Sequence, residues 1–238
     1  RSIAVKLVGV FPENPARSQP EPSVQGLVAL FDGATGRPLM TCDGAALTYR
    51  KTAADSALAA ALLSRPDAEV LAIAGAGGLA PFVAEAIAAV RPIRRILIWN
   101  RTRPRAEAMA RSLRRPDREV TVVDDLDAAL PQADIVSAVT MATAPVIHGH
   151  HLKPGVHVDL IGAYLPAMRE ADAETVRRAG RMFCDHRAGF AASGDGAAPV
   201  AEGLITGPED HLFDLCPGHH PARTSRETVP SGFSRTLS

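Results

Sequence analysis

Residues 74–80 read AGAGGLA, and their glycines are the first candidates for chemistry. They follow the apolar run EVLAIA and precede an apolar pattern with helical spacing. In a GxGxxA motif at such a junction, the first glycine permits a tight turn, the second lets a phosphate approach the backbone, and the small last residue lets the helix pack on the strand. The free N–H groups where the helix begins favour an anionic group. We therefore predict that a dinucleotide pyrophosphate contacts this turn, through Gly75, Ala76, Gly77, Gly78 and Leu79.

A second polar group follows the next apolar run, where the chain reads WNRT at residues 99–102. Domains that prefer NAD usually carry an Asp or Glu here, which binds the ribose 2′-hydroxyl and would repel a 2′-phosphate. This chain instead offers the amide of Asn100, the planar cation of Arg101 and the hydroxyl of Thr102. This pattern favours NADP(H) over NAD(H). The alternative is that Arg101 is an ordinary solvated loop charge.

Two lysines and two threonines complete the candidates. Lys6 lies inside an apolar β-run and Lys51 precedes a predicted helix. Either could hold a substrate carboxylate facing a nicotinamide, although a lysine in a β-run is more often an outward-facing edge charge. Thr140 follows a predicted strand and is a candidate contact to the nicotinamide side of the cofactor, and Thr52 is a further candidate cofactor contact.

The histidine clusters HGHH at 148–151 and GHH at 218–220 resemble metal ligands only superficially. Neither has the i, i+4 helical spacing, nor the nearby Cys, His or Asp residues, that would complete a tetrahedral site. We expect no metal, and we expect both clusters to be solvated loop histidines. The basic stretch 111–118 lacks interleaved aromatic residues, so a solvated helix end is a better interpretation than a nucleic-acid contact.

Bulk composition favours a small-molecule partner. The 26 Lys and Arg residues balance the 26 Asp and Glu residues, so no overall charge attracts nucleic acid or an anionic membrane. No apolar run approaches the length needed to span a bilayer, and the first residues lack a signal-peptide pattern. Three scattered cysteines, Cys42, Cys184 and Cys216, fit a reducing compartment better than a disulfide framework, so we expect a cytoplasmic protein.

The elements that would position these residues form an α/β fold. Runs at 3–11, 26–32 and 37–42 predict a β-rich opening, and a helix is predicted over 52–65. Strands and helices then alternate, which predicts a Rossmann-type, doubly wound parallel sheet. Its strands are expected at 69–74, 95–99, 119–123, 134–139, 156–161 and 181–185, and its helices at 79–90, 104–113, 125–130 and 171–180. Residues 219–238 show no clear periodicity and are predicted to form no secondary structure.

Several blocks of the chain resemble the ornithine cyclodeaminase/mu-crystallin family. They include VKLVGVFPENP, LTYRKTAADSALAA, AGAGGLA, ADIVSAVT, LKPGVHVDLIGA and READ, in the family's order, and cover roughly residues 4–225. The resemblance implies a discontinuous fold in which a β-rich α+β substrate and dimerisation domain surrounds an inserted Rossmann domain, and it implies a homodimer. The implied boundaries are 1–51 for part of the first domain, 52–190 for the NAD(P)-binding domain and 191–238 for a return segment with an irregular tail.

By this resemblance, Lys6 falls on the family's active-site lysine. Lys51 lies where the family usually has an arginine that grips the substrate carboxylate; lysine keeps the charge but loses the bidentate fork. Gly194 and Asp195 resemble a family step near the pocket, without a role derived from the residues. Relative to the family, the chain begins inside the first domain, and its tail after about residue 226 does not match the family's final apolar helix.

Tyr164 separates this chain from the cyclodeaminases it resembles. In those enzymes the strand matching 156–161 is followed by Gly-Gly-Asp, and the Asp assists loss of ammonia and cyclisation; here the matching residue is Tyr164. A phenol, with an ordinary pKa of about 10, cannot replace a carboxylate base at neutral pH. The stretch VDLIGAYLPAMREAD is instead similar to reductases of Δ1-pyrroline-2-carboxylate and Δ1-piperideine-2-carboxylate.

The sequence therefore predicts an NADPH-dependent ketimine reductase that converts a cyclic imino acid to L-proline or L-pipecolate. Tyr164 would be a wall of the pocket or a proton donor. One alternative is an ornithine cyclodeaminase or a related amino-acid dehydrogenase. Another, from a different class, is an NADPH-dependent small-ligand binding protein of mu-crystallin type.

Overall fold

The structure is a computed structural model that describes residues 1–179, 181–216 and the backbone of 229–232. Its contacts divide the chain into two compact units, of which the first is Arg1–Thr52 and the second begins at Ala53. Within the described residues, no helix is both long enough and apolar enough to cross a membrane. The prediction that 191–238 returns to the first domain stays a prediction.

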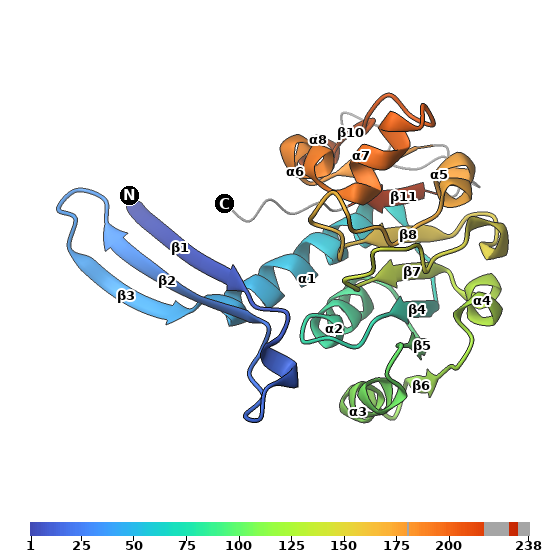
Figure 1. The fold of residues 1–238 in the computed structure, drawn as a ribbon, viewed down its shortest axis with the longest axis horizontal. Helices are drawn as coiled ribbons and strands as arrows, with labels where there is room; N and C mark the ends of the chain where they lie inside the picture. Colours follow the sequence, from blue (N-terminus) through green and yellow to red (C-terminus); the bar gives the residue numbers. More distant parts are fainter. Residues whose placement is uncertain (180, 217–228, 233–238) are drawn as a thin grey trace. The chain divides into compact units, whose positions relative to one another are not determined.

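The first unit is an antiparallel three-stranded sheet in the order β1-β2-β3 (Figure 1). β1 is Ser2–Val10, β2 is Val24–Asp32 and β3 is Pro38–Asp43, with a short 3-10 turn at Asn14–Ala16. The three predicted strands are confirmed to within two residues. Asp32 closes the tight connection between β2 and β3, because its carboxylate accepts hydrogen bonds from the backbone of Ala34 and Thr35.

Helix α1, Gly44–Leu63, begins eight residues before the predicted start at 52, so that boundary was wrong. The physical reason lies in the first turn. Asp43 accepts a hydrogen bond from the N–H of Ala46 at 2.7 Å, which satisfies a free donor of the helix start. Gly44 packs so closely on β2 that a Cβ there would lie 2.5 Å from the carbonyl carbon of Gly26. This contact across the fold leaves no periodic signal in the sequence.

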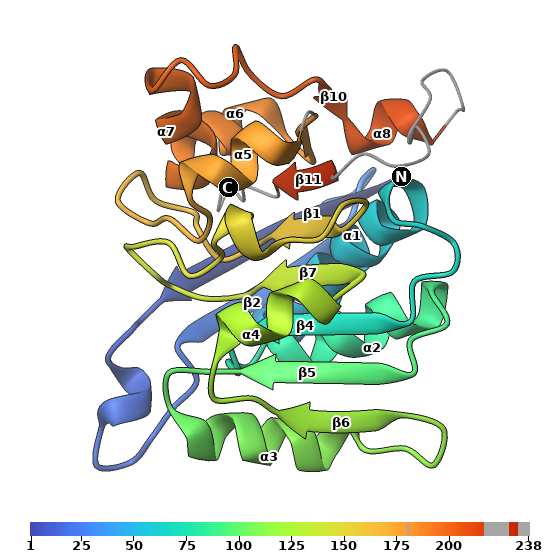
Figure 2. The same cartoon turned by 90° about the vertical axis from the view of Figure 1, so that its right-hand side faces the viewer.

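The second unit is a parallel sheet of eight strands in the order β10-β9-β11-β8-β7-β4-β5-β6 (Figure 2). Chain order reverses between β4 and β7, which is the topological switch point where doubly wound sheets bind ligands. The strand bounds are β4 Val70–Ala74, β5 Arg95–Trp99, β6 Glu119–Val122, β7 Ile135–Ala138, β8 His157–Leu160, β9 Phe183–Cys184, β10 Asp210–His211 and β11 Val229–Gly232.

Helices cover both faces of this sheet. The side chains of Leu71, Ile73 and Ile135 on one face pack with α1, α2 and α3. Val136 and Val158, on the other face, pack with α4 and with the segment that leads into β8. The helix bounds are α2 Ala80–Val90, α3 Arg103–Leu113, α4 Leu126–Ala129, α5 Ala173–Ala179, α6 Arg187–Ala192, α7 Gly194–Ala201 and α8 Leu212–Leu215, with 3-10 turns at Leu130–Gln132 and Gly149–His151.

The predicted Rossmann-type sheet is confirmed, with two corrections. Strand β10 was not predicted, and β11 lies in the tail that was predicted to have no secondary structure. β11 pairs with β8 and β9 through backbone hydrogen bonds, so a short Pro-containing segment without alternation can still complete the sheet. The rest of the tail, 219–228 and 233–238, lies outside the described residues, and so does the GHH cluster.

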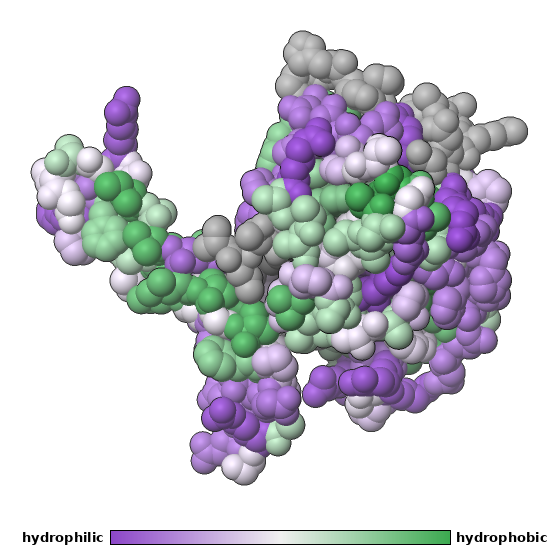
Figure 3. All heavy atoms as spheres, turned by 45° about the horizontal axis from the view of Figure 1, so that its top comes forward, coloured by the Kyte–Doolittle hydropathy of each residue, from purple (hydrophilic) through white to green (hydrophobic). Residues whose placement is uncertain are grey.

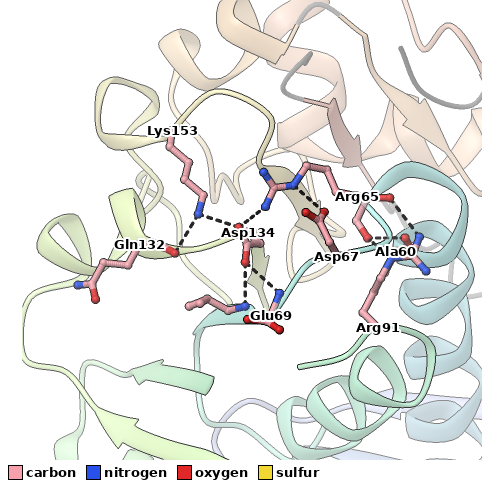
Figure 4. A network of polar contacts seen from close by, with 10 residues as sticks. Ala60, Arg65, Asp67, Glu69, Arg91, Gln132, Asp134 and Lys153 are labelled. Atoms are coloured by element: carbon pink, nitrogen blue, oxygen red, sulfur yellow. Dashed lines mark hydrogen bonds and ion pairs between the residues drawn. The ribbon is translucent and has the colours of Figure 1, made fainter. Parts of the chain in front are cut away.

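A buried carboxylate fastens the amino ends of the central strands, far along the sheet from the glycine turn. Asp134, just before β7, accepts hydrogen bonds from the backbone N–H groups of Glu69 and Val70 and ion-pairs with Arg65 and Lys153 at 2.6 and 2.7 Å (Figure 4). Burial alone would raise the pKa of Asp134, but these donors outweigh it and lower the pKa below its ordinary value. Asp134 therefore stabilises the fold as a carboxylate.

Candidate functional site

The glycine turn between β4 and α2 is built as the sequence predicts. Gly75 has φ +111°, a backbone conformation that residues other than glycine rarely adopt. Its N–H donates to the carbonyl of Trp99 at the end of β5, and a Cβ on Gly75 would lie 2.5 Å from the carbonyl oxygen of Val139 after β7. Only glycine fits where the chain passes between the ends of these two strands.

Gly77 faces open space rather than protein. A Cβ built there would meet no atom within 4 Å, and both Gly77 and Gly78 are exposed. Helix α2 begins at Ala80 with no side chain capping its first turn, since Leu79 has no polar side chain to do so. The first N–H groups of α2 and the positive end of its dipole therefore lie beside this opening. The turn fits a bound pyrophosphate, with a backbone surface that a side chain at Gly77 would cover.

Asn100 fastens this turn to the end of β5. Its side-chain oxygen accepts a hydrogen bond from the N–H of Ala76 at 3.1 Å, and its side-chain amide donates to the carbonyl of Thr102 at 2.9 Å. An aspartate could keep the first bond but not donate the second. Arg101 and Thr102 are exposed beside it. Asn100 thus stabilises the conformation of the turn, and Arg101 and Thr102 lie at the surface next to it.

Thr140 and Gly162 lie where β7 and β8 end, and a single carboxylate joins them. Glu170 accepts hydrogen bonds from both the N–H and the hydroxyl of Thr140, each at 2.6 Å, and from the N–H of Gly162 at 2.6 Å. The side chain of Glu170 is fully buried. Sequence reasoning placed Glu170 only within the READ block; the one signal available was an acidic residue shortly after a buried strand.

A second buried carboxylate supports the first. Asp195, at the start of α7, accepts hydrogen bonds from the backbone N–H of Glu170 at 2.9 Å and of Ala171 at 3.1 Å. Burial and the neighbouring Asp195 charge raise the pKa of Glu170 to about 8, although its three donors act in the opposite direction. Burial likewise raises the pKa of Asp195 to about 6. Asp195, in the Gly194–Asp195 pair that the sequence singled out, therefore holds the backbone of the loop at Glu170.

Tyr164 lies on the loop that leaves β8 and is half-buried. The loop is closed by hydrogen bonds from the N–H groups of Met168 and Gly194 to the carbonyl of Leu165. A Cβ on Gly194 would lie 1.9 Å from the carbonyl oxygen of Met168, so α7 packs directly on this loop. Tyr164 thus follows the end of β8 at the edge of the sheet that carries Thr140, Gly75 and Asn100.

The remaining predicted residues belong to the first unit. Lys6 is half-buried in β1 opposite Val28, and Lys51 is exposed on α1. Thr52 is buried, and its hydroxyl donates to the carbonyl of Thr48 at 2.6 Å. Lys6 lies in a strand, as the sequence predicted. Lys51 and Thr52, which the sequence placed just before and at the start of a helix, lie inside α1 because that helix begins at Gly44. The roles of all three residues at the site stay predictions.

The HGHH segment is not a plain solvated loop. Gly149–His151 forms a 3-10 turn, and Nδ1 of His148 lies 2.8 Å from a carboxylate oxygen of Asp127, with His151 at 3.6 Å from the same carboxylate. Among the described residues, no group of His, Cys, Asp and Glu is arranged to hold a metal ion. The segment packs beside α4 and takes no part in the site at the glycine turn.

Comparison with known proteins gives consistent matches along almost the whole chain. Residues 1–230 match the model of the ornithine cyclodeaminase/mu-crystallin family. A Delta(1)-pyrroline-2-carboxylate reductase of Paracoccus denitrificans is 41% identical over 224 residues, which are 94% of this chain and 70% of that protein. The ketimine reductase mu-crystallin of Mus musculus is 36% identical over 212 residues, 87% of this chain and 64% of that protein.

A solved structure has the same fold. It is the Delta(1)-pyrroline-2-carboxylate reductase of Thermococcus litoralis in complex with NADH and L-proline, with a TM-score of 0.90 and 30% identity. The match covers 98% of this chain and 72% of that one.

Proposed function

This chain belongs to the ornithine cyclodeaminase/mu-crystallin family, and from that premise we propose that it reduces a cyclic imino acid with NADPH. The substrate is Δ1-pyrroline-2-carboxylate or Δ1-piperideine-2-carboxylate, and the product is L-proline or L-pipecolate. The relatives named above as Delta(1)-pyrroline-2-carboxylate and ketimine reductases support this substrate class. It is an oxidoreductase that acts on a C=N bond.

The observation that carries this proposal is Tyr164 at the end of β8. The cyclodeaminases that the chain resembles have a carboxylate there, which assists the loss of ammonia. Tyr164 offers a phenol and no carboxylate at this position, so the base that the cyclodeaminases use is missing. The phenol can stand beside an imine ring as a wall, or donate a hydrogen bond to the imine nitrogen. The half-buried position of Tyr164 suits the role of a wall, which we favour.

In the proposed reaction the bound nicotinamide would supply a hydride to C2 of the imine in its protonated form, so that the nitrogen already carries the proton of the amine product. The chain's own residues bind and orient. The glycine turn from Gly75 to Leu79 receives the pyrophosphate, and Thr140 lies at the neighbouring strand end. Lys6, with Lys51 as a weaker candidate, binds the substrate carboxylate, because a cation there fixes which face of the C=N bond meets the nicotinamide.

The preference for NADPH rests on Asn100, Arg101 and Thr102. The amide of Asn100 already serves the turn, so a 2′-phosphate would be bound by the exposed side chains of Arg101 and Thr102. The related Thermococcus enzyme was solved with NADH, so the choice of NADPH comes from this chain's own residues. We also infer a cytoplasmic location from its three free cysteines, Cys42, Cys184 and Cys216.

We infer that the protein forms a homodimer through its three-stranded sheet. Leu7 pairs with Leu27 in the register of β1 and β2, so both side chains lie on the same face. Ile3, Val5, Leu7 and Leu27 are 52, 45, 65 and 47% exposed, which leaves that face apolar and open to solvent (Figure 3). Exposed apolar patches of this kind mark protein interfaces. Sedimentation equilibrium tests this: Leu7→Asp should convert a dimer to a monomer, and an unchanged dimer would exclude this face.

An absorbance assay tests the proposed reaction. The protein is mixed with NADPH and Δ1-pyrroline-2-carboxylate, and separately with NAD and ornithine. We expect oxidation of NADPH only with the imine. Formation of proline from ornithine would show a cyclodeaminase instead, and NADPH binding without turnover of the imine or of ornithine would show a binding protein.

A further inference from the structure

The buried carboxylate of Glu170 occupies a position that the proposed reaction does not yet use. It lies between the ends of β7 and β8, beside the glycine turn, and it is 0% exposed. We propose that Glu170 is a positioning residue that fixes Thr140 and Gly162 where the nicotinamide end of the cofactor binds. This proposal rests on the proposed function only in taking NADPH as the ligand.

The hydrogen bonds show why one side chain controls this region. One oxygen of Glu170 accepts from the N–H and the hydroxyl of Thr140, and the other accepts from the N–H of Gly162. A Cβ on Gly162 would lie 1.8 Å from the carbonyl oxygen of Thr140, so the two strand ends are in direct backbone contact. Without the carboxylate, two backbone N–H groups and a hydroxyl would be left without their acceptor.

Thr140 also connects Glu170 to the glycine turn. A Cβ built on Gly75 would lie 3.3 Å from the Cγ2 methyl of Thr140. The hydroxyl of Thr140 donates to Glu170 and accepts from the N–H of Ala142 at 3.2 Å. Its hydrogen is therefore engaged within the protein, and Thr140 contributes shape to the cofactor site more than a donor. Thr140 therefore lies between Glu170 and the start of the glycine turn.

Glu170 also closes the loop that carries Tyr164. The loop runs from Gly162 to Glu170, and the bond from the N–H of Gly162 to Glu170 joins its two ends. Asp195 holds the far end by accepting from the N–H groups of Glu170 and Ala171. The loop that carries Tyr164, the predicted wall of the pocket, is thus held at both ends by buried carboxylates.

The charged groups around Glu170 influence whether its carboxyl group is ionised, and so how well it accepts its three hydrogen bonds. Asp195 on α7 is the charged group that faces it, and Arg169, which ion-pairs with Glu202, lies close enough to lower the pKa of Asp195. Three donors directed at Glu170 fit an ionised carboxylate, whereas burial and Asp195 raise its pKa to about 8. The hydrogen bonds from Thr140 and Gly162 to Glu170 should therefore strengthen as the pH rises through about 8, because the ionised carboxylate is the better acceptor.

Calorimetric titration with two ligands tests the proposal. NADPH carries the nicotinamide, and 2′-phospho-ADP-ribose has the same adenine, 2′-phosphate and pyrophosphate without it. In Glu170→Gln we expect the Kd of NADPH to rise about tenfold, because roughly one charge-assisted hydrogen bond is lost. The Kd of the fragment, 2′-phospho-ADP-ribose, should stay within about twofold of its wild-type value. In wild type, the ratio of the two affinities should favour NADPH increasingly from pH 6.5 to 9, and Glu170→Gln should remove that trend.

Asp134→Asn is the matched control. It alters another buried carboxylate with two backbone donors, at the opposite ends of the strands, so it should leave the ratio of affinities unchanged. If Glu170→Gln does not fold, Thr140→Val, which removes one of the three donors, should weaken NADPH by about threefold and spare the fragment. Equal weakening of both ligands, or no weakening of NADPH, would overturn the proposal. Because only binding is measured, lack of imine turnover would refute the proposed reaction and leave the positioning role standing.

Discussion

Replacement of Arg101 by alanine probes the choice between NADPH and NADH. Arg101 is exposed next to Asn100, and no ion pair holds it within the part of the chain that the structure describes. Its guanidinium is therefore free to bind a phosphate bidentately. A hydrogen bond to a charged group contributes about 1.5–3 kcal/mol, and exposure to solvent reduces this to about 1–2 kcal/mol. The Kd of NADPH should rise about 5- to 30-fold.

The assay is calorimetric titration of wild type and Arg101→Ala with NADPH and with NADH. The Kd of NADH should stay the same, because NADH has no 2′-phosphate. Arg103→Ala is the control: this neighbouring cation is already engaged by Glu107 at 2.9 Å and by Asp124, so its loss should change neither affinity by much. Equal changes for both cofactors, or none for NADPH, would refute the role assigned to Arg101.

Three further changes test other parts of the account. Gly77→Val should leave the melting temperature within a few degrees of wild type, because a Cβ there meets nothing within 4 Å, yet weaken NADPH about 100-fold by covering the phosphate surface; tight binding would place the pyrophosphate elsewhere. Lys6→Met should raise the KM of the imine about 10- to 100-fold with the Kd of NADPH unchanged, and an unaffected KM would remove Lys6 from the site. Asp134→Asn should cost about 2–4 kcal/mol at pH 7 in urea unfolding. Because the pKa of Asp134 is lowered, its contribution is present above the ordinary carboxyl range and is lost as pH falls through its folded pKa; a cost that persisted undiminished in acid would show that its charge is not responsible.

Much of the parallel sheet could be predicted from the sequence, because strands buried on both faces are nearly unbroken apolar runs. β5 was predicted at its observed bounds, 95–99. The start of α1 could not be predicted from the sequence, because it depends on the approach of Gly44 to β2 rather than on apolar spacing. β11 could not be predicted either, because its pairing with β8 and β9 is set by the tertiary fold.

The candidate site divides in the same way. The glycine turn is a local device, and its spacing alone predicted both its position and its chemistry. Glu170 acts across the fold: its partners are 30 and 8 residues away in the chain, and only the fold shows that both face one carboxylate. Asn100 lies between these cases, since its position was predicted and its bond to Ala76 was not.

Transfer of deuterium from NADPH tests the central claim most directly. The protein is incubated with NADPH that carries deuterium at C4 of the nicotinamide, on each face in turn, and with Δ1-pyrroline-2-carboxylate, and the product is examined by mass spectrometry and chiral chromatography. Hydride transfer to C2 predicts L-proline with one deuterium at C2 from one of the two labelled cofactors and none from the other. Unlabelled proline from both, or no proline while NADPH binds, would contradict imine reduction by this chain.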